Sequence, residues 1–349
     1  MLWMLKALLP YALLAFAISA GLYPLVKMIC KKFNWVDIPN ERKIHTAPVP
    51  RIGGVMIFLS FLIVALIYKK TNPQLALLHK YFSDLGFILS ASAAFLLGFV
   101  DDIWGVKALK KLALQFAIGF AIAFSGLIID NVTVLGVQLH FGIFSYLLTA
   151  LWVVSLLNAV NLMDGMDGLA SGIMIISLGF TFVISVVEAN YFVTSLSGIL
   201  IGSILGFYIF NFPPAKIFMG DSGSYFLGCM YSMIAMMGMK KTSMAIMMAI
   251  PLVLLLIPLA DIIYITVRRT KRHQGIFHAD KNHIHHRLLN LGFSVVQINF
   301  LVYLVCLVFG LIALLIALTG GQYGLLFFFL IICLVIAGFA VVRILEQRD

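Results

Sequence analysis

The stretch 295–317, VVQINFLVYLVCLVFGLIALLIA, contains 23 residues without a charged side chain. An α-helix rises 1.5 Å per residue, so about 20 apolar residues cross the roughly 30 Å hydrocarbon core of a bilayer. The rest of the chain has the same character, because 62% of its 349 residues are hydrophobic and only 11% are charged. Soluble domains carry about 25% charged residues. The sequence therefore predicts a polytopic membrane protein of the all-α class.

Breaks at charged residues and at Pro- and Gly-rich segments divide the chain into about eleven expected transmembrane helices. The expected spans are 2–26, 53–68, 82–100, 112–129, 144–162, 168–187, 191–210, 223–239, 243–266, 295–317 and 322–342. No long linker and no clear repeat interrupts this pattern. We therefore expect a single integral membrane domain over residues 1–349.

The positions of Lys and Arg indicate how these spans are oriented. If the first span runs from outside to inside, six of the 24 basic residues lie on the outer side and the other eighteen on the inner side. This excess fits the positive-inside rule and predicts that the N-terminus is outside and the C-terminus inside. In a membrane protein the net charge of +10 reflects this bias and contact with anionic lipid, so we expect no nucleic-acid partner.

Four polar residues follow one another at intervals of three in the stretch 158–172, NAVNLMDGMDGLASG. Residues at this spacing share one helix face, so Asn158, Asn161, Asp164 and Asp167 are expected to form a polar stripe at the inner end of the fifth span. A hydrogen-bond ladder between helices that ends in a helix cap is one interpretation. Ionisable residues at this depth are costly, and the two acids therefore favour a functional role.

Two other breaks on the predicted inner side also carry acids. Asp101 and Asp102 follow the third span, and because adjacent carboxylates repel each other, we expect a divalent cation or Lys111 beside them. Asp221 precedes the eighth span. It either caps that helix or holds a metal ion whose phosphate lies at the helix amino terminus.

Two basic segments complete the inner side. Segment 34–54 carries Arg42, Lys43, His45 and Arg51, which either bind phosphate or rest on anionic lipid headgroups. Segment 268–292 carries His283, His285, His286 and Arg287. A positive-inside loop explains the lysines and arginines but not the clustered histidines. No paired cysteines or H-E-x-x-H motif accompany them, so phosphate is a more natural partner than zinc.

Together these blocks resemble the polyprenyl-phosphate N-acetylhexosamine-1-phosphate transferases of glycosyltransferase family 4. The resemblance rests on Asp101–Asp102, on N-x-x-N-L-x-D-G-x-D-G-L-A at 158–170, on F-M-G-D-S-G-S at 218–224 and on H-x-H-H-R at 283–287. The segment D-x-P-N-x-R-K-x-H at 37–45 is similar to the undecaprenyl-phosphate GlcNAc-1-phosphate transferase branch. The phospho-MurNAc-pentapeptide transferase branch typically has ten spans and three consecutive histidines.

The resemblance implies transfer of GlcNAc-1-phosphate from UDP-GlcNAc to undecaprenyl phosphate, with Mg²⁺ or Mn²⁺ and release of UMP. The reaction would take place at the cytoplasmic face of the bacterial inner membrane. It would be the first membrane step of a cell-envelope glycan pathway, such as that of lipopolysaccharide or teichoic acid.

The resemblance also implies roles for the polar residues. By similarity, Asp221 would be the principal metal ligand, and Asp102 would contribute to the metal site and, with Asp101, face the lipid phosphate. Asp164 and Asp167 would line the nucleotide site with Asn161, Asn211 and Phe218 would lie near the uracil, and His285 and His286 would lie near the diphosphate. Lys111 is expected among the catalytic residues, and the other expected substrate-binding residues are Asn158, Arg42, Lys43, His45, His283 and Arg287.

Two alternatives remain open from the sequence. One is a phospho-MurNAc-pentapeptide transferase of peptidoglycan synthesis. The other is a secondary transporter, although transporters place charged residues near the bilayer midplane, whereas these acids cluster at the inner ends of the spans. A homodimer is a further expectation that the sequence leaves untested.

Overall fold

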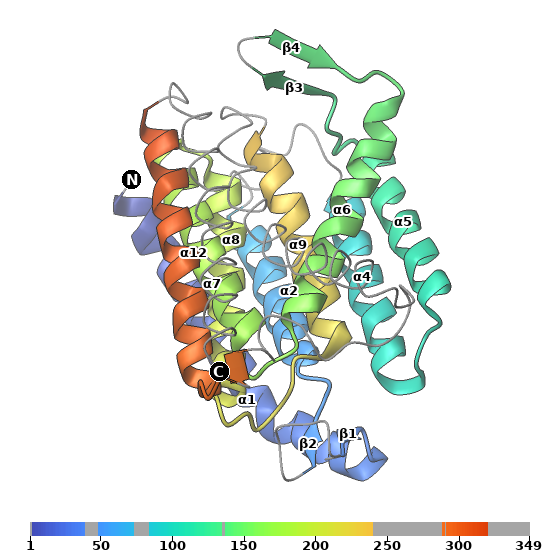
Figure 1. Cartoon of the computed structure of the whole chain (residues 1–349). Helices are drawn as coiled ribbons and strands as arrows, with labels where there is room; N and C mark the ends of the chain where they lie inside the picture. Colours follow the sequence, from blue (N-terminus) through green and yellow to red (C-terminus); the bar gives the residue numbers. More distant parts are fainter. Residues whose placement is uncertain are drawn as a thin grey trace.

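The computed structural model describes residues 2–38, 48–72, 84–134, 137–239, 288–289 and 291–319. This part of the chain is a bundle of helices with two short antiparallel strand pairs, β1–β2 and β3–β4 (Figure 1). The helices are α1 (Leu2–Phe33), α2 (Gly54–Thr71), α4 (Asp84–Trp104), α5 (Ala108–Phe124), α6 (Phe144–Met163), α7 (Leu169–Val187), α8 (Tyr191–Asn211), α9 (Gly220–Met239) and α12 (Val295–Leu318). The strands are β1 (Val36–Asp37), β2 (Val49–Pro50), β3 (Asn131–Val134) and β4 (Val137–His140).

Seven of the described helices are long and apolar enough to cross a membrane, which supports the expected all-α polytopic fold. They are α1, α2, α4, α6, α7, α8 and α12. Helices α5 and α9 occupy the expected spans 112–129 and 223–239 without being among the seven. The expected spans 243–266 and 322–342 lie outside the described residues. The total of eleven, the outward N-terminus and the single domain therefore remain predictions.

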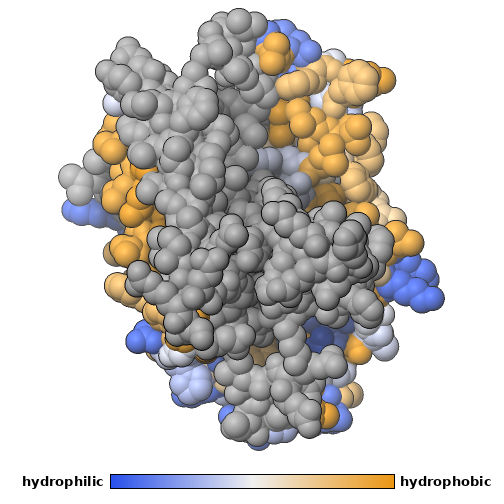
Figure 2. All heavy atoms as spheres, in the orientation of Figure 1, coloured by the Kyte–Doolittle hydropathy of each residue, from blue (hydrophilic) through white to orange (hydrophobic). Residues whose placement is uncertain are grey.

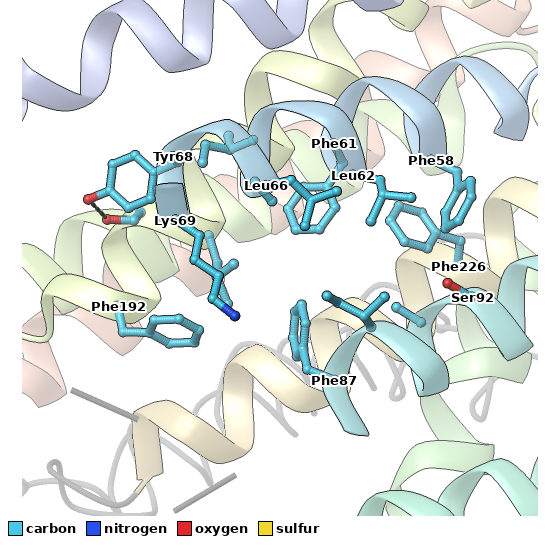
Figure 3. Close-up of a pocket in the computed structure, with 16 residues that line it drawn as sticks. Phe58, Phe61, Leu62, Leu66, Tyr68, Lys69, Phe87, Ser92, Phe192 and Phe226 are labelled. Atoms are coloured by element: carbon cyan, nitrogen blue, oxygen red, sulfur yellow. Dashed lines mark hydrogen bonds between the residues drawn. The ribbon is translucent and has the colours of Figure 1, made fainter. Parts of the chain in front are cut away.

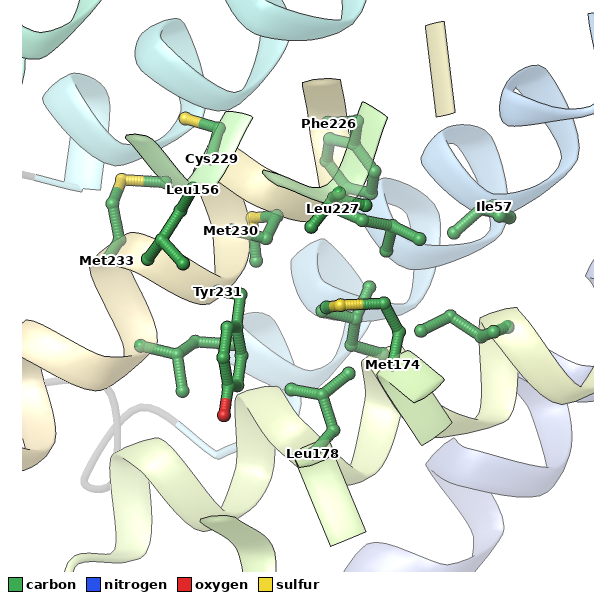
Figure 4. Close-up of a cluster of buried hydrophobic side chains, with 14 of the residues drawn as sticks. Ile57, Leu156, Met174, Leu178, Phe226, Leu227, Cys229, Met230, Tyr231 and Met233 are labelled. Atoms are coloured by element: carbon green, nitrogen blue, oxygen red, sulfur yellow. The ribbon is translucent and has the colours of Figure 1, made fainter. Parts of the chain in front are cut away.

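Helix α9 lies inside the bundle and packs against α2, α4, α6, α7 and α8. Every residue from 222 to 236 is buried. Figure 4 shows Phe226 and Tyr231 of α9 among the side chains of the surrounding helices, including Leu156 and Met174. A helix that is buried on all sides must be apolar all round, and this explains the run of Met, Phe, Leu and Tyr after Asp221.

Glycines set the contact between α1 and α8. Gly198, Gly202 and Gly206 recur every four residues, so they lie on one face of α8. A Cβ atom at Gly202 would lie 2.2 Å from the carbonyl oxygen of Ala12, and one at Gly206 would lie 2.4 Å from that of Phe16. The two backbones approach as closely as in other membrane helix pairs that meet through small residues.

Apolar side chains also cover much of the outside of the bundle. Figure 2 shows hydrophobic residues in orange along its flanks. Leu13 of α1, Leu114 of α5 and Leu311 of α12 are each about half exposed. Surface of this kind is unfavourable in water but suits contact with lipid tails. The described residues thus form a multi-pass membrane protein whose polar groups require a separate explanation.

We expect Gly202→Ala to lower the apparent midpoint of thermal unfolding in detergent. The added methyl group must push α1 away from α8, and overpacking of this kind costs about 1–3 kcal/mol. Gly179→Ala on α7 is the matched control, because a Cβ atom there would meet nothing within 4 Å. That control should be neutral or slightly stabilising, since Ala favours a helix over Gly. Equal midpoints for the two variants would contradict the close packing of α1 on α8.

Candidate functional site

The amino end of α9 is held by a carboxylate from another helix. Asp102 of α4 accepts the backbone N–H groups of Asp221 and Ser222, both at 2.9 Å. The first N–H groups of a helix have no partner within the helix, and a negative charge suits them. The expectation that Asp221 caps this helix is therefore wrong. Helix α9 begins at Gly220, and Asp102 is its cap.

Glycines allow three backbone segments to meet at this point. Gly220 has a φ of +74°, and a Cβ atom on it would lie 2.2 Å from the carbonyl oxygen of Arg51. A Cβ atom on Gly98 of α4 would lie 2.1 Å from the carbonyl oxygen of Asp221. The N–H of Gly54 donates to the carbonyl of Met219 at 2.8 Å. Segment 51–54 thus forms one wall of the polar cluster that surrounds Asp221.

Lys111 of α5 joins two of the acids in this cluster. Its Nζ forms an ion pair with Asp101 and lies 3.4 Å from Oδ2 of Asp221. The other oxygen of Asp101 accepts the N–H of Val106 at 2.7 Å. Burial opposes the charge on Lys111, but Asp101 and Asp221 outweigh that effect and raise its pKa. The neighbouring carboxylates of Asp101 and Asp102 therefore point to different partners.

Asn161 of α6 holds the second oxygen of Asp221. Its Nδ2 donates to Oδ1 of Asp221 at 2.8 Å and to Oγ of Ser224 at 3.0 Å. Burial, followed by the neighbouring carboxylates of Asp101 and Asp102, raises the pKa of Asp221 to about 7. A cation placed beside Asp221 would favour its charged form.

The polar stripe predicted along one helix face is shorter than expected. Helix α6 ends at Met163, Asp164 is its C-cap, and Asp167 lies in the turn before α7. Gly168, with a φ of +76°, is the N-cap of α7. Burial, then the charges of Asp102 and Asp221, raises the pKa of Asp164. Both acids of this turn therefore lie in a loop, and Asp164 is near the acids of the cluster.

Two of the predicted asparagines form hydrogen bonds to neighbouring helices and turns. Asn158 exchanges hydrogen bonds with Gln115 of α5, and its Nδ2 lies 2.8 Å from Oε1 of Gln115. This contact matches the interpretation of a hydrogen-bond ladder between helices. Asn211 is 2% exposed; its Oδ1 accepts from the N–H of Gly168 at 3.2 Å and from Oγ of Ser171 at 2.7 Å. Its Nδ2 donates to the carbonyl of Ile217.

The remaining predicted residues divide between the described and undescribed parts of the chain. Phe218 lies beside segment 51–54, where its N–H donates to the carbonyl of Pro50 at 2.8 Å and its carbonyl accepts from Gly53 at 2.9 Å. The following predicted substrate-binding or catalytic residues lie outside the described residues: Arg42, Lys43, His45, His283, His285, His286 and Arg287. Their roles remain predictions.

Two further residues contact the cluster: Arg51, which the sequence places in the basic segment 34–54, and Ser224, to which the sequence assigned no role. Nη2 of Arg51 lies 3.9 Å from Oδ1 of Asp102, so Arg51 is a second cation near the acids. Ser224 is fully buried and accepts from Asn161. The spacing of Asp221 and Ser224 on α9 pointed to a shared face, but nothing local indicated that Asn161 would face both.

The donor atoms of this cluster fit a hard divalent cation. Asp101, Asp221 and Asn161 offer only oxygen as metal ligands, and oxygen is what Mg²⁺ and Mn²⁺ prefer. Among the described residues, no three His, Cys, Asp or Glu side chains are grouped so that they could hold an ion by themselves. Mg²⁺ is commonly bound through one or two carboxylates together with waters and substrate phosphates. The cluster fits that mode rather than a closed protein cage.

An apolar pocket lies farther along the same helices. Figure 3 shows Phe58 and Phe226 at one end, and Tyr68, Lys69 and Phe192 at the other. Apart from Lys69, the hydroxyl pair of Tyr68 and Ser195 at 2.7 Å and the hydroxyl of Ser92, its lining is hydrocarbon. Such a lining offers nothing to bind a metal and little to bind a diphosphate. The polar cluster at the start of α9 is therefore the candidate active site.

Comparison with known proteins places this chain beside membrane glycosyltransferases. The family model described as glycosyl transferase family 4 matches residues 84–239. A probable undecaprenyl-phosphate N-acetylglucosaminyl 1-phosphate transferase of Bacillus subtilis is 36% identical over 295 residues, which cover 83% of this chain and 79% of that protein. A decaprenyl-phosphate N-acetylglucosaminephosphotransferase of Mycobacterium tuberculosis is 33% identical over 304 residues, 80% of this chain and 75% of that protein.

A third relative carries a different name. A phospho-N-acetylmuramoyl-pentapeptide-transferase of Streptococcus pyogenes is 38% identical over 246 residues, which cover 64% of this chain and 70% of that protein. The relatives therefore include both branches between which the sequence left a choice.

We expect Gly220→Ala to lower the midpoint of thermal unfolding in detergent by more than Gly105→Ala does. Both glycines have a positive φ, of +74° and +69°, so Ala carries a similar backbone strain of about 1–2 kcal/mol at either position. Only at Gly220 would the new Cβ atom also meet Arg51 and Asp102, because nothing lies within 4 Å of it at Gly105. If the two variants unfold together, the close approach at the start of α9 is not important for stability.

Proposed function

We propose that this chain, which belongs to glycosyl transferase family 4, transfers GlcNAc-1-phosphate from UDP-GlcNAc to undecaprenyl phosphate. The products are undecaprenyl-diphosphate-GlcNAc and UMP. The observation that carries the proposal is the meeting of Asp101, Asp221, Lys111 and Asn161, from four different helices, at the buried start of α9.

The names of the relatives support GlcNAc as the sugar. The two relatives named for N-acetylglucosamine cover more of this chain than the relative named for the muramoyl pentapeptide. The segment from Asp37 to His45 points the same way, since it resembles the GlcNAc-1-phosphate transferase branch. Transfer of phospho-MurNAc-pentapeptide remains the second candidate.

The reaction brings two charged phosphate groups within bonding distance, and their repulsion must be neutralised. Lys111 can provide one positive charge, because its ammonium group is already held between Asp101 and Asp221. Arg51 provides another beside Asp102. Holding both reactants beside such charges is the main contribution that a protein makes to phosphoryl transfer.

We propose Mg²⁺ or Mn²⁺ as the cofactor, held by Asp221 with Asn161 beside it. When bound, the ion would neutralise negative charge on the diphosphate of the sugar nucleotide. Asp102 was a second expected ligand. Both of its oxygens already accept N–H groups from α9, so we assign it to holding the helix end instead.

The lipid phosphate itself is a competent nucleophile. The second pKa of a phosphate monoester is about 6, so most of it is a dianion at neutral pH and needs no strong general base. We propose that one of its oxygens attacks the β-phosphorus of UDP-GlcNAc in line. A new P–O bond forms, the bond from that phosphorus to the oxygen bridging to the α-phosphorus breaks, and UMP leaves with the bridging oxygen. Asp101 keeps Lys111 oriented toward the reacting phosphates.

The proposed location is the cytoplasmic face of the bacterial inner membrane. One substrate carries a hydrocarbon tail and the other is soluble, so the site must open both to the lipid and to water. The excess of Lys and Arg on one side of the predicted spans supports the cytoplasmic side. A homodimer remains an expectation without support from the single chain described here.

Purified protein should release UMP from UDP-GlcNAc when undecaprenyl phosphate is present. Release should be slower by at least about tenfold with UDP-GalNAc or UDP-MurNAc-pentapeptide, because a site that hydrogen-bonds one sugar discriminates against a different one. The measurement is a coupled UMP assay in detergent micelles, with a reaction lacking the lipid as the control. Faster release from the pentapeptide substrate would assign the protein to the other branch, and substrate flux in proteoliposomes without UMP release would indicate a transporter.

Asp221→Asn should reduce turnover by at least about a hundredfold, because a metal ion contributes several kcal/mol to such reactions and each 1.36 kcal/mol is tenfold in rate. Chelation with EDTA should have the same effect on the wild type, and added Mg²⁺ or Mn²⁺ should reverse it. Asp130→Asn is the matched control, since Asp130 is exposed beside the β3–β4 hairpin. Unchanged gel-filtration profiles would show that both variants fold. A near-normal rate for Asp221→Asn would remove Asp221 from the metal site.

A further inference from the structure

Beyond Gln297, which belongs to the capping box at the start of the helix, the mostly apolar helix α12 carries the polar side chains of Asn299 and Tyr303. Asn299 and Tyr303 are four residues apart and therefore share one face of that helix. Helix α12 packs against α7. Asn299 is only 3% exposed, although an amide group is costly to bury among apolar helices. Neither residue belongs to any motif that the sequence analysis identified.

Both side chains bind the backbone of the turn between α6 and α7. Nδ2 of Asn299 donates to the carbonyl oxygen of Asp167 at 2.7 Å. The hydroxyl of Tyr303 donates to the carbonyl oxygen of Gly168 at 2.6 Å. Asn211 of α8 accepts the N–H of Gly168 at 3.2 Å, so successive peptide groups of this turn are bound by side chains from two helices.

The packing around Tyr303 keeps its hydroxyl within reach of this turn. A Cβ atom on Gly172 of α7 would lie 2.1 Å from the hydroxyl oxygen of Tyr303. A larger residue at this position would therefore displace the ring. The hydroxyl of Tyr208 on α8 also lies 3.3 Å from that of Tyr303. Oδ1 of Asn299 has no hydrogen-bond partner among the described residues, which leaves the bond to Asp167 as the reason for an amide here.

The turn bound in this way carries two acids. Asp164 lies near the carboxylates of Asp102 and Asp221, and Oδ2 of Asp167 accepts the N–H of Ala215 at 2.9 Å. The direction of both carboxylates depends on the backbone of residues 164–168. A shift of this backbone would move the acids while leaving the helices in place.

We propose that Asn299 and Tyr303 are positioning residues, which fix the turn 164–168 so that Asp164 and Asp167 meet the sugar nucleotide. They touch no substrate themselves. This proposal rests on the function proposed above, with the turn on the nucleotide side of the site. It assigns to α12 a role in nucleotide affinity, in addition to its contact with lipid.

The test uses Tyr303→Phe and Asn299→Leu in the full-length protein. Each removes one hydrogen-bond donor and keeps most of the side-chain volume. One hydrogen bond corresponds to a change of about three- to tenfold, so the KM for UDP-GlcNAc should rise by that factor in each variant. The KM for undecaprenyl phosphate should stay within about twofold of the wild type. The double variant should show less than the product of the two single effects, because both residues hold the same turn.

Tyr231→Phe is the matched control. Tyr231 is a fully buried tyrosine of α9 whose hydroxyl lies 3.5 Å from that of Thr181 on α7 and does not contact the turn. This variant should keep both KM values. If Tyr303→Phe and Asn299→Leu alter both KM values equally, together with a parallel fall in the unfolding midpoint, their role is only structural and the proposal is wrong.

Amide hydrogen exchange over residues 164–172 provides a readout that needs no turnover. Exchange there should be faster in Tyr303→Phe than in Tyr231→Phe, because the turn loses one of its anchors. If the wild type does not turn over UDP-GlcNAc, the proposed function fails, and the exchange rates still decide whether Tyr303 holds the turn. Equal exchange in both variants would overturn the positioning role.

Discussion

The backbone N–H groups that begin helix α9 must find acceptors inside a bundle of apolar helices, and the site is arranged around this requirement. Asp102 satisfies two of them from α4. Gly98 and Gly54 carry no side chains, so the backbones of α4 and α2 can approach closely enough for this to happen. Asp101, the preceding residue of α4, does not bind the start of α9 and instead pairs with Lys111. The two adjacent carboxylates thus have different partners: Asp102 binds the backbone at the start of α9, and Asp101 pairs with Lys111.

The same arrangement concentrates negative charge. Asp101 and Asp221 share the ammonium group of Lys111, and burial among other acids raises the pKa of Asp221 and of Asp164. Carboxylates gathered in a partly buried cluster repel one another, and Lys111 and Arg51 offset this repulsion only in part. Backbone N–H groups hold the carboxylates of Asp101 and Asp102, whereas the side chains of Asn161 and Lys111 hold that of Asp221. Such a site is ready for a ligand that brings positive charge with it.

Hydropathy predicted the bounds of three consecutive helices closely. The expected spans 144–162, 168–187 and 191–210 differ from α6, α7 and α8 by only one residue at an end. Spacing was less reliable for the acids, because a period of three cannot show that helix α6 ends at Met163, before Asp164 and Asp167. Contacts between distant segments were not predictable from local patterns. The local sequence does not reveal that Asp102 caps α9 or that Asn158 pairs with Gln115.

In the sequence, the acids of the site are separate from several of the groups that orient them. The family model matches residues 84–239, which include Asp101, Asp102, Asp164, Asp167 and Asp221 together with Lys111 and Asn161. The wall formed by segment 51–54 comes before that range, and the donors of α12 come after it. A fragment trimmed to the family match would keep these acids, Lys111 and Asn161, but would lose Arg51 and part of the frame around them. For this protein, the segment that matches the family model is shorter than the set of segments that build the candidate site.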